Sequence, residues 1–594
     1  MTRIIGIVKD EKELDKINKR LKDLGDGIIL NLSNKKVNSA NVKTKSDYIN
    51  ETKLINELAD KIRNISINWN MISFPEAKKL AKHDGIPLYE CTSLHFELVL
   101  RSLIANIELI KKVIEKEKPD MFLVIDGKDF LSKTIITSLK ELNAKYEIVS
   151  DRNVNLINIF REKTKFIAGR YIKPVVLDNY VKLKSFNYKN KNYGDKKVMF
   201  FSYLNLDPQI MLPIIEEMKK QNKNYLIFAL ALDVQEAFAK KGIKFNTFAD
   251  YDLSEINKVL DKKKKELDQI WEILYQDRRF MYDNINLWEI LEDELHYTVF
   301  KHFYEVVRLI EGIKIVIKKE EINIIVMGSD VHRFGKTIAF VGNKLEIKSL
   351  VLQHGVAGRL GFVPVTSTKI AVWGESTKKF LLQNNVNEEK IVITGASKFD
   401  IIKNKEYDKE EVYKQFNLDK DKKIILFGTQ TVPEKEEMFK AVINSLQDEQ
   451  LIIKLHPKDD VDFYNSRLNN IKNKVVVVKD YDIYNFLNIA DLTISRASST
   501  VVIESMLFNV PVITLNLANI KGSNEMIDYN DYGCVIDVKE EKELKNAIND
   551  VFNNKKIKEK LEKNMEKFIK DYAYKIDGKS TERVINLIDE IYQK

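Results

Sequence analysis

Short runs of apolar residues recur along this chain, and most of them are followed by a longer stretch with helical periodicity. The runs Ile322–Met327 and Ser349–Gln353 are apolar at nearly every position, which is typical of parallel strands buried on both faces. A regular alternation of such strands with helices predicts α/β domains built on parallel sheets.

Polar stretches divide the chain into three blocks. We predict an N-terminal Rossmann-like α/β domain over 1–190, which ends in the polar linker Asn187–Asp195. A second Rossmann-type domain is expected over 196–402, with a charged helical insertion at about 254–320, and a third over 405–594. The predicted fold class is therefore α/β with three Rossmann-type domains.

Blocks one and two share an internal similarity. Ile110–Glu117 aligns without gaps to Ile313–Glu320, and a Lys-Thr-Ile tripeptide recurs at the same separation, at 133 and 336. This register sets Asp151 opposite His354, so a true repeat would make block one a Rossmann-like unit without the His-Gly pair. The alternative is a chance likeness between helix-strand segments of a chain rich in Lys and Ile.

Three polar groups of residues directly follow predicted strands. They are Gln353-His354-Gly355, the pair Lys454 and His456, and the segment Ser495–Glu504. Because ligands of open parallel sheets bind outside the carboxyl ends of the strands, we expect these groups to line one cleft. Lys454 and His456 lie two residues apart and would present ammonium and imidazole to the same anion. For either histidine alone, a structural role is the alternative.

The hydroxyl-rich turn Ser498-Ser499-Thr500 predicts a helix start with a carboxylate, Glu504, about one turn in. Unpaired N–H groups and the positive end of the helix dipole at such a place suit a phosphate group. An ordinary Ser/Thr N-cap is the alternative interpretation.

Composition and charge narrow the class of protein. The 594 residues are 44% hydrophobic and 31% charged, and the net charge of +9 is spread over mixed Lys/Glu helices. This favours a globular protein and argues against nucleic-acid binding, and weak attraction to an anionic membrane surface stays open. We expect a cytoplasmic protein, because the two cysteines, Cys91 and Cys534, lie far apart in the sequence and because no signal peptide or membrane span is apparent.

Five motifs together resemble a known class of enzyme. In chain order, they resemble motifs of the GT-B-fold transferases of bacterial surface-polymer synthesis: Gln353-His354-Gly355, Ala371–Gly374, Val392–Asp400, Lys454–Pro457 and Ser498–Glu504. Over 196–594 the chain is most similar to capsular-polysaccharide glycosyltransferases and CDP-glycerol glycerophosphotransferases. UDP-N-acetylglucosamine 2-epimerases and lipid-A-disaccharide synthases are more distant.

The resemblance implies a GT-B pair of domains after the N-terminal one, and a glycosyltransferase that moves a sugar from a nucleotide-activated donor to a growing surface glycan or glycolipid. A CDP-glycerol-type glycerophosphotransferase is the alternative. Epimerisation is disfavoured because Arg496-Ala497-Ser498-Ser499 stands where epimerases have glycines. A non-catalytic scaffold within a polymer-synthesis complex would not need His354, Lys454, His456 and Glu504 together.

The resemblance also implies roles for single residues. His354 would take the proton of the acceptor hydroxyl, or alternatively donate to phosphate. Gly355, Asp330 and His332 would lie on the acceptor side, although a capped helix start at Ser329 explains the last two as well. The expected donor-binding residues are Gly428, Thr429, Gln430, Lys454, His456, Arg496, Ser498, Ser499, Thr500 and Glu504. We expect no metal and no cofactor, since Asp459 and Asp460 lie in an ordinary polar loop.

Overall fold

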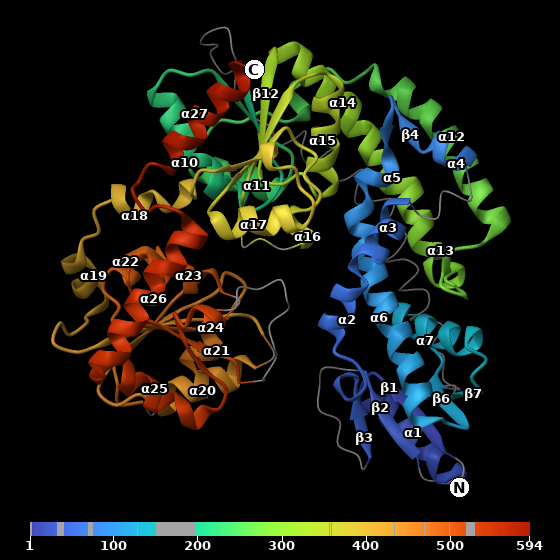
Figure 1. Cartoon of the computed structure of the whole chain (residues 1–594), viewed down its shortest axis with the longest axis horizontal. Coiled ribbons are helices and arrows are strands. Elements are labelled where there is room, and N and C mark those ends of the chain that lie inside the picture. Colours follow the sequence, from blue (N-terminus) through green and yellow to red (C-terminus); the bar gives the residue numbers. More distant parts are fainter. Residues whose placement is uncertain are drawn as a thin grey trace. The chain divides into compact units, whose positions relative to one another are not determined.

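Three parallel sheets and their helices organise the chain, as the computed structural model shows (Figure 1). The structure describes residues 3–25, 27–32, 41–68, 75–127, 129–149, 197–355, 357, 359–432, 434–468, 471–497, 499–517 and 529–593. Packing divides the chain into two units. Unit 1 holds 1–190, 244–321 and 332–345, and unit 2 holds 191–243, 322–331 and 346–594.

The sheet of unit 1 has the strand order β3-β2-β1-β6-β7, with all neighbours parallel. Its strands are β1 (Ile4–Val8), β2 (Gly27–Asn31), β3 (Val42–Thr44), β6 (Met121–Ile125) and β7 (Tyr146–Val149). Every residue of β1 is buried, as the unbroken apolar run predicts. Helix α1 (Glu11–Leu24) begins at the N-cap Asp10 and buries Leu14, Ile17 and Leu21, which lie on one helical face.

The helices of unit 1 come from two distant parts of the chain. The first part supplies α2 (Glu51–Glu57), α3 (Ala59–Asn68), α4 (Pro75–Leu80), the hairpin β4–β5 (Lys82–His83 and Ile86–Pro87), α5 (Leu88–Cys91), α6 (Ser93–Glu117) and α7 (Phe130–Glu141). The second supplies α12 (Ile256–Asp277), the hairpin β10–β11 (Met281–Tyr282 and Ile285–Asn286), α13 (Trp288–Tyr297), a π-helix (Thr298–Phe303), α14 (Tyr304–Glu320) and α15 (Arg333–Lys344).

This grouping differs from the division predicted from the sequence. The insertion at 254–320 was expected in the second domain, but α12 packs on α4, α13 on α7, and α15 on α5 and α6. The amphipathic helices bury their apolar faces against one another, whereas their position in the chain says nothing about which partner they choose. The predicted linker Asn187–Asp195 lies outside the described residues.

The first sheet of unit 2 has the order β15-β14-β13-β12-β8-β9 and is parallel throughout. Its strands are β8 (Lys197–Ser202), β9 (Tyr225–Ala229), β12 (Ile322–Met327), β13 (Lys348–Leu352), β14 (Lys369–Val372) and β15 (Ile391–Ile393). The neighbouring helices in unit 2 are α10 (Asp207–Lys220), α11 (Leu232–Lys240), α16 (Arg359–Phe362), α17 (Glu375–Gln383) and α18 (Ile401–Asn404).

The second sheet of unit 2 has the order β18-β17-β16-β19-β20-β21, again all parallel. Its strands are β16 (Ile424–Gly428), β17 (Gln450–Lys454), β18 (Val475–Val478), β19 (Leu492–Ser495), β20 (Val512–Leu515) and β21 (Ile536–Val538). The helices are α19 (Lys409–Phe416), α20 (Lys435–Ser445), α21 (Val461–Asn465), α22 (Ile483–Leu487), α23 (Thr500–Leu507), α24 (Tyr529–Tyr532), α25 (Glu541–Asn553), α26 (Lys555–Ala573) and α27 (Ser580–Gln593).

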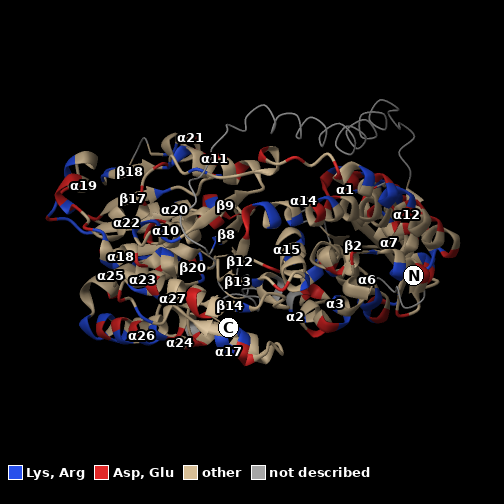
Figure 2. Ribbon diagram, turned by 90° about the horizontal axis from the view of Figure 1, so that it is seen from above, with Lys and Arg blue, Asp and Glu red and all other residues tan. Residues whose placement is uncertain are grey.

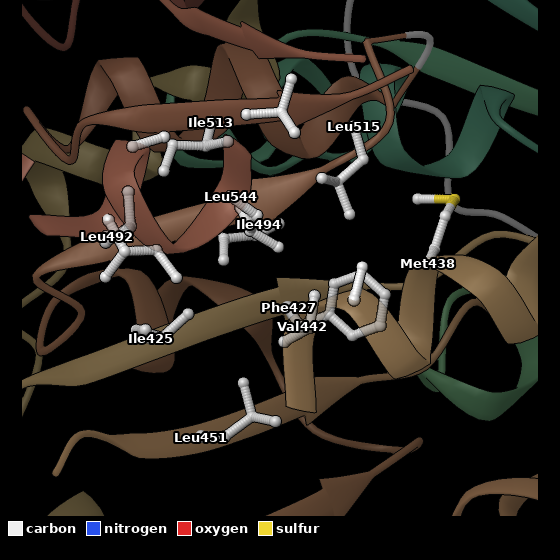
Figure 3. Packing of buried hydrophobic residues seen from close by; sticks show 14 of the residues in the cluster. Ile425, Phe427, Met438, Val442, Leu451, Leu492, Ile494, Ile513, Leu515 and Leu544 are labelled. Atoms are coloured by element: carbon white, nitrogen blue, oxygen red, sulfur yellow. The ribbon is translucent and has the colours of Figure 1, made fainter. Parts of the chain in front are cut away.

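Apolar side chains of the strands and of α20 and α25 fill the core of this second sheet. Figure 3 shows Phe427 of β16 beside Val442 of α20, with Ile494 of β19 and Leu544 of α25 in the same cluster. The four residues are almost fully buried. Burial at this density fixes the strand ends that carry the polar groups.

The last helix, α27, joins the two sheet domains of unit 2. Backbone N–H groups of Ser580 and Thr581 donate to the Asp400 carboxylate at 3.0 and 2.6 Å. The Arg583 guanidinium donates to the Thr394 carbonyl at 2.7 Å. The predicted fold class, α/β with several Rossmann-like parallel-sheet domains, is confirmed.

The internal repeat is confirmed as well, because equivalent contacts recur 203 residues apart. Thr44 N donates to Asp47 Oδ2 at 2.6 Å, and Thr247 N donates to Asp250 Oδ2 at 2.7 Å. One residue further on, Tyr48 and Tyr251 donate to Glu117 and Glu320 at 3.0 and 3.1 Å. Such matching contacts are not expected from a chance likeness of composition.

The elements of the two copies correspond in order, and some of them keep the offset of 203 residues. Both bounds of α7 and α15 are related by 203 residues, and the order β2-β1-β6-β7 in one sheet matches β9-β8-β12-β13 in the other. We call the two copies repeat one and repeat two, with 4–149 and 197–352 as their described extents. Asp151, expected opposite His354, lies outside the described residues.

Charges are mixed along the surface helices. Figure 2 shows Lys and Arg interspersed with Asp and Glu along helices such as α12 and α26. No helix in the described parts of the chain is both long enough and apolar enough to cross a membrane.

Candidate active site

His354 follows β13 and lies over the end of β12. Its Nδ1 is 2.8 Å from the Gly328 carbonyl, which can only accept, so Nδ1 carries the proton of the neutral ring. The lone pair is then on Nε2. Phe362 stacks on the imidazole at 4.7 Å and holds its plane. A half-exposed, oriented imidazole with a basic Nε2 can act as a general base.

The buried Gln353 positions the turn that carries His354. Its Nε2 donates to the Gly355 carbonyl at 2.8 Å and to Thr377 Oγ1 at 3.1 Å, and its Oε1 accepts from Trp373 N at 2.6 Å. Gly355 is thus held through its carbonyl. The sequence singled out Gln353 only as part of a motif, and its role depends on groups that lie about 20 residues further along the chain.

The two other residues predicted on the acceptor side are placed differently. Asp330 is 1% exposed, and its Oδ2 accepts from Thr366 N and Ser367 N at 2.7 and 2.6 Å. This carboxylate therefore holds a loop of its own domain. His332 belongs to unit 1, where it is the N-cap of α15 without a side-chain capping bond, so this helix does not start at Ser329. Burial lowers the pKa of His332.

A second polar centre lies where β16 and β17 end. Thr429, also buried, accepts from His456 N at 3.0 Å and donates to Asp459 Oδ2 at 2.7 Å. His456 Nδ1 accepts from Lys458 N at 3.2 Å, so Nε2 carries the proton and can donate to an anion. The tautomer of His456 is thus opposite to that of His354. His456 can donate a hydrogen bond to a phosphate, whereas His354 can accept a proton.

Asp459 organises this centre, and the sequence interpretation had treated it as an ordinary loop residue. It is 2% exposed and also accepts from Tyr464 Oη at 2.8 Å and Lys435 Nζ at 3.2 Å. Burial opposes its ionisation, but the hydrogen bonds from Thr429, Tyr464 and Lys435 lower its pKa. An HxxD spacing, His456 to Asp459, was the available signal.

Lys454 does not point to the same place as His456. Its Nζ donates to the carbonyls of Lys479 at 2.7 Å and Leu455 at 3.3 Å. Burial lowers its pKa, against the attraction of Asp480 and Asp482. Lys454 therefore holds the loop after β18 in place. The predicted sharing of one anion by Lys454 and His456 is not the arrangement found.

The start of α23 is available in part for an anion. Ser499 is its N-cap and is 8% exposed, but its side chain makes no capping bond, while Thr500 is exposed. Ser498 lies outside the described residues. Arg496 forms a 3.2 Å ion pair with Glu434. Because the Ser499 side chain does not cap the helix, a phosphate would find N–H donors in its first turn.

Glu504 lies one turn into α23 and faces two groups that the sequence analysis did not assign. Burial raises its pKa, while Lys398 and a hydrogen bond from Tyr484 favour its charged form. Burial also lowers the pKa of Lys398, which lies over the Trp373 ring at 4.9 Å. All three residues are of intermediate exposure.

Gly428 and Gln430 complete the predicted donor side. The Gly428 carbonyl accepts from Ser495 Oγ at 2.9 Å, and a Cβ at this glycine would lie 3.2 Å from the same oxygen. Gln430 is half-exposed beside Thr429. The described residues include no group of three or more His, Cys, Asp or Glu side chains that could hold a metal ion.

Comparisons with known proteins extend these observations. Solved structures with similar folds include a glycosyltransferase from Rickettsia africae. Its sequence identity to this chain is 14% and the TM-score is 0.44, and the alignment covers 68% of this chain and 100% of the other. Another is the UDP-GlcNAc 2-epimerase from Neisseria meningitidis bound to UDP-GlcNAc, with 16% identity, 66% and 100% coverage, and a TM-score of 0.43. Curated protein sequences give no match.

A family model matches the region around the second polar centre. It is the model of CDP-Glycerol:Poly(glycerophosphate) glycerophosphotransferase, and it matches residues 369–590. The match supports transferase activity with a nucleotide-activated donor, as the resemblance implied. Residues 369–590 are thus similar to the CDP-glycerol glycerophosphotransferase family.

Proposed function

We propose that the protein transfers a group from a nucleoside-diphosphate-activated donor to a hydroxyl of a growing surface polymer, glycan or glycolipid. The observation that carries this proposal is that the two histidines have opposite tautomers, His354 with a basic Nε2 and His456 with an Nε2–H donor. The family match to 369–590 favours CDP-glycerol as the donor. Transfer of a sugar from a nucleotide sugar is the second candidate, since the two histidines are compatible with attack at phosphorus and with attack at an anomeric carbon.

In the proposed reaction, His354 takes the proton as the acceptor oxygen attacks. With CDP-glycerol, the new bond forms to the phosphorus that carries the glycerol, and the bond to CMP breaks. With a nucleotide sugar, the new bond forms to the anomeric carbon, and a nucleoside diphosphate leaves. His456 and the first turn of α23 would stabilise the charge that develops on the leaving phosphate.

The donor side is proposed to include Gly428, Thr429, Gln430, His456 and the start of α23, with Arg496 at its edge and Glu504 placed for the ribose hydroxyls. Lys454 would act on this site through the loop that it holds. We propose a metal-independent reaction, in which helix N–H groups and imidazole serve as the electrostatic partners of the diphosphate. Contact with the inner face of the membrane would follow from a lipid-linked acceptor.

The nucleotide released tests the proposal. The purified chain is incubated with CDP-glycerol or with each of several nucleotide sugars, and with a glycerol phosphate polymer as acceptor. Release of CMP identifies glycerophosphate transfer, and release of a nucleoside diphosphate identifies glycosyl transfer. Free monosaccharide without an acceptor would instead identify an epimerase-type hydrolysis, and absence of release with every donor would favour a scaffold.

A further inference from the structure

The two repeats differ in length inside one helix. Asp84 of the hairpin β4–β5 and Asp283 of β10–β11 both have a positive φ at the turn, and they are 199 residues apart. By the C-terminal ends of α6 and α14, the separation has become 203, as for Glu117 and Glu320. Repeat two therefore carries additional residues between its hairpin and the end of α14.

The stretch that holds these additional residues includes the π-helix Thr298–Phe303, which joins α13 to α14. In repeat one, the matching helix α6 is α-helical from Ser93 to Glu117. A π-segment inside an α-helix weakens the regular hydrogen-bond ladder, and such segments are found frequently at functional sites. The π-helix thus marks a place where the structure of repeat two differs from that of repeat one.

Buried polar groups without hydrogen-bond partners gather at the π-helix. His302 is 6% exposed, and its Nδ1 has no partner among the described residues. Thr298 Oγ1, Arg333 Nε and Glu305 Oε2 are likewise buried and make no hydrogen bond in the part of the chain that the structure describes, although Glu305 Oε2 is ion-paired with Arg333. Native proteins leave few such groups unpaired, so their concentration at one place points to a ligand that pairs with them.

The charges at this place favour an anion. Arg333, the first residue of α15, lies 2.8 Å from Glu305, and Lys301 lies 2.7 Å from the other oxygen of the same carboxylate. One carboxylate thus faces two cations. Nearby, His95 is already paired with Glu294 at 2.6 Å and meets the His302 ring edge-on at 4.7 Å. Burial, together with Arg333, His95 and Lys301, lowers the pKa of His302, so this imidazole is neutral.

The site is open to solvent at its charged end. The side chains of Lys301, Glu305 and Arg333 are 22–27% exposed, whereas His302 forms the buried end. In repeat one, the position of Arg333 is taken by Phe130, which has no donor. The polar group is therefore specific to repeat two, the repeat that also carries His354.

We propose that His302, Arg333 and Thr298 form a binding subsite for a phosphate group of the acceptor. The assignment to the acceptor rests on the proposed function, in which donor binding belongs to residues of the family-matched region. The guanidinium Nε–H and the imidazole N–H would donate to phosphate oxygens, and Lys301 would balance the second charge. A chain of glycerol phosphate units offers such a group next to each hydroxyl.

The test uses intrinsic fluorescence of the full chain, because Trp271 lies 6.2 Å from Phe300 of the π-helix and 4.8 Å from His296. Glycerol 3-phosphate and inorganic phosphate are titrated in separate experiments, with glycerol as the uncharged control. We expect a saturable change in fluorescence with both anions. The apparent affinity should be higher for glycerol 3-phosphate if the subsite binds a whole polymer unit, and the same for both anions if it binds the phosphate alone. Glycerol should produce no change.

Arg333→Lys keeps the charge but removes the Nε–H, and His302→Gln removes the ring. Each is expected to weaken the apparent affinity about tenfold, as loss of a charged hydrogen bond does. Arg20→Gln, which breaks an ion pair with Glu147 in repeat one, is the matched control and should bind as the wild type does. Thermal melting verifies folding of each variant.

The proposal is overturned if phosphate causes no saturable change, if glycerol causes the same change, or if both variants bind like the wild type. Binding is measured here without turnover. A chain that binds phosphate at this subsite but releases no nucleotide would therefore refute the proposed function and not the subsite.

Discussion

Asp84 of repeat one forms an ion pair with Lys314 of repeat two, at 2.5 Å. The reverse contact is also present, because Asp283 of repeat two pairs with Lys111 of repeat one at 3.2 Å. Lys111 and Lys314 are equivalent residues in the 203-residue register, and each aspartate lies at the turn of its hairpin. Within unit 1, repeat one and the part of repeat two that belongs to this unit thus exchange hairpin contacts reciprocally, as two subunits of a symmetric dimer exchange elements.

Double-mutant cycles should detect this reciprocity. For Asp84→Ala with Lys314→Ala, and for Asp283→Ala with Lys111→Ala, we expect coupling energies of about 0.2–1 kcal/mol each, because the pairs are partly exposed. Chemical denaturation measures them. The crossed pair Asp84→Ala with Lys111→Ala should show no coupling. Coupling in the crossed pair, or in only one of the true pairs, would contradict the reciprocal arrangement.

Glu117 should make the stability of unit 1 depend on acid pH. A hydrogen bond from Lys43 lowers its pKa against burial, and Tyr48 and Arg3 add to the effect. A carboxyl with a lowered folded pKa stabilises above its unfolded pKa, near 4.5, and the contribution is lost as the pH falls through the folded value. Glu117→Gln should therefore destabilise the protein at pH 7 and flatten the loss of stability below pH 4.5.

The exposed Glu115 on the same helix is the matched control for Glu117. Glu115→Gln should leave both the unfolding midpoint at neutral pH and its decline in acid unchanged. Denaturation curves recorded between pH 7 and pH 3 separate the two variants, and equal curves would argue against a special role for Glu117.

His354→Ala should lower turnover about 10²–10⁴-fold, the usual cost of losing a general base, while donor affinity stays nearly intact. The reason is that its imidazole is held by the Gly328 carbonyl and Phe362, in the sheet domain that precedes the donor side. Steady-state kinetics and calorimetric nucleotide titration measure the two quantities. His83→Ala, which removes a histidine paired with Glu311 in unit 1, serves as control. A large loss of donor affinity would reassign His354 to phosphate binding.

Thr429→Val should weaken nucleotide binding, because it removes the hydroxyl that links His456 N to the Asp459 carboxylate. We expect about a tenfold loss of affinity in calorimetry. Thr514→Val is the matched control, since Thr514 is equally buried and donates to Asp537 at 2.8 Å in the same sheet domain. Both variants should lose stability, but only Thr429→Val should lose affinity. Equal nucleotide affinities would remove Thr429 and Asp459 from the donor site.

The fragment 196–594 should be poorly soluble when expressed alone. Although the sequence predicted a domain boundary at Asn187–Asp195, helices α12, α13 and α15 of the fragment pack on α4, α7 and α5–α6 of the missing part. Their apolar faces would be left in water and promote association. Size-exclusion chromatography of the fragment, with and without co-expressed 1–195, measures this. A monomeric fragment that binds nucleotide would restore the boundary drawn from the sequence.

The sequence by itself determined the elements and much of the repeat. Strand β12 has the predicted bounds, and His354 stands beyond the end of β13 as expected. Both follow from local patterns, since an apolar run buried on two faces can form little else than an inner parallel strand. The offset of 203 residues could also be found from the sequence, because equivalent caps, turns and strands need similar residues in each copy.

Only the tertiary structure decided where polar side chains point and which helices pack together. Asp330 and Lys454 stand near strand ends as predicted, but both are hydrogen-bonded to the backbone of neighbouring loops. The Asp330 carboxylate accepts from Ser367 N, and Lys454 Nζ donates to the Lys479 carbonyl. Asp459 and Lys398 gained importance through partners far away in the chain. Strand patterns record burial, which is a local property, whereas a hydrogen bond depends on the position of a second group that packing alone supplies.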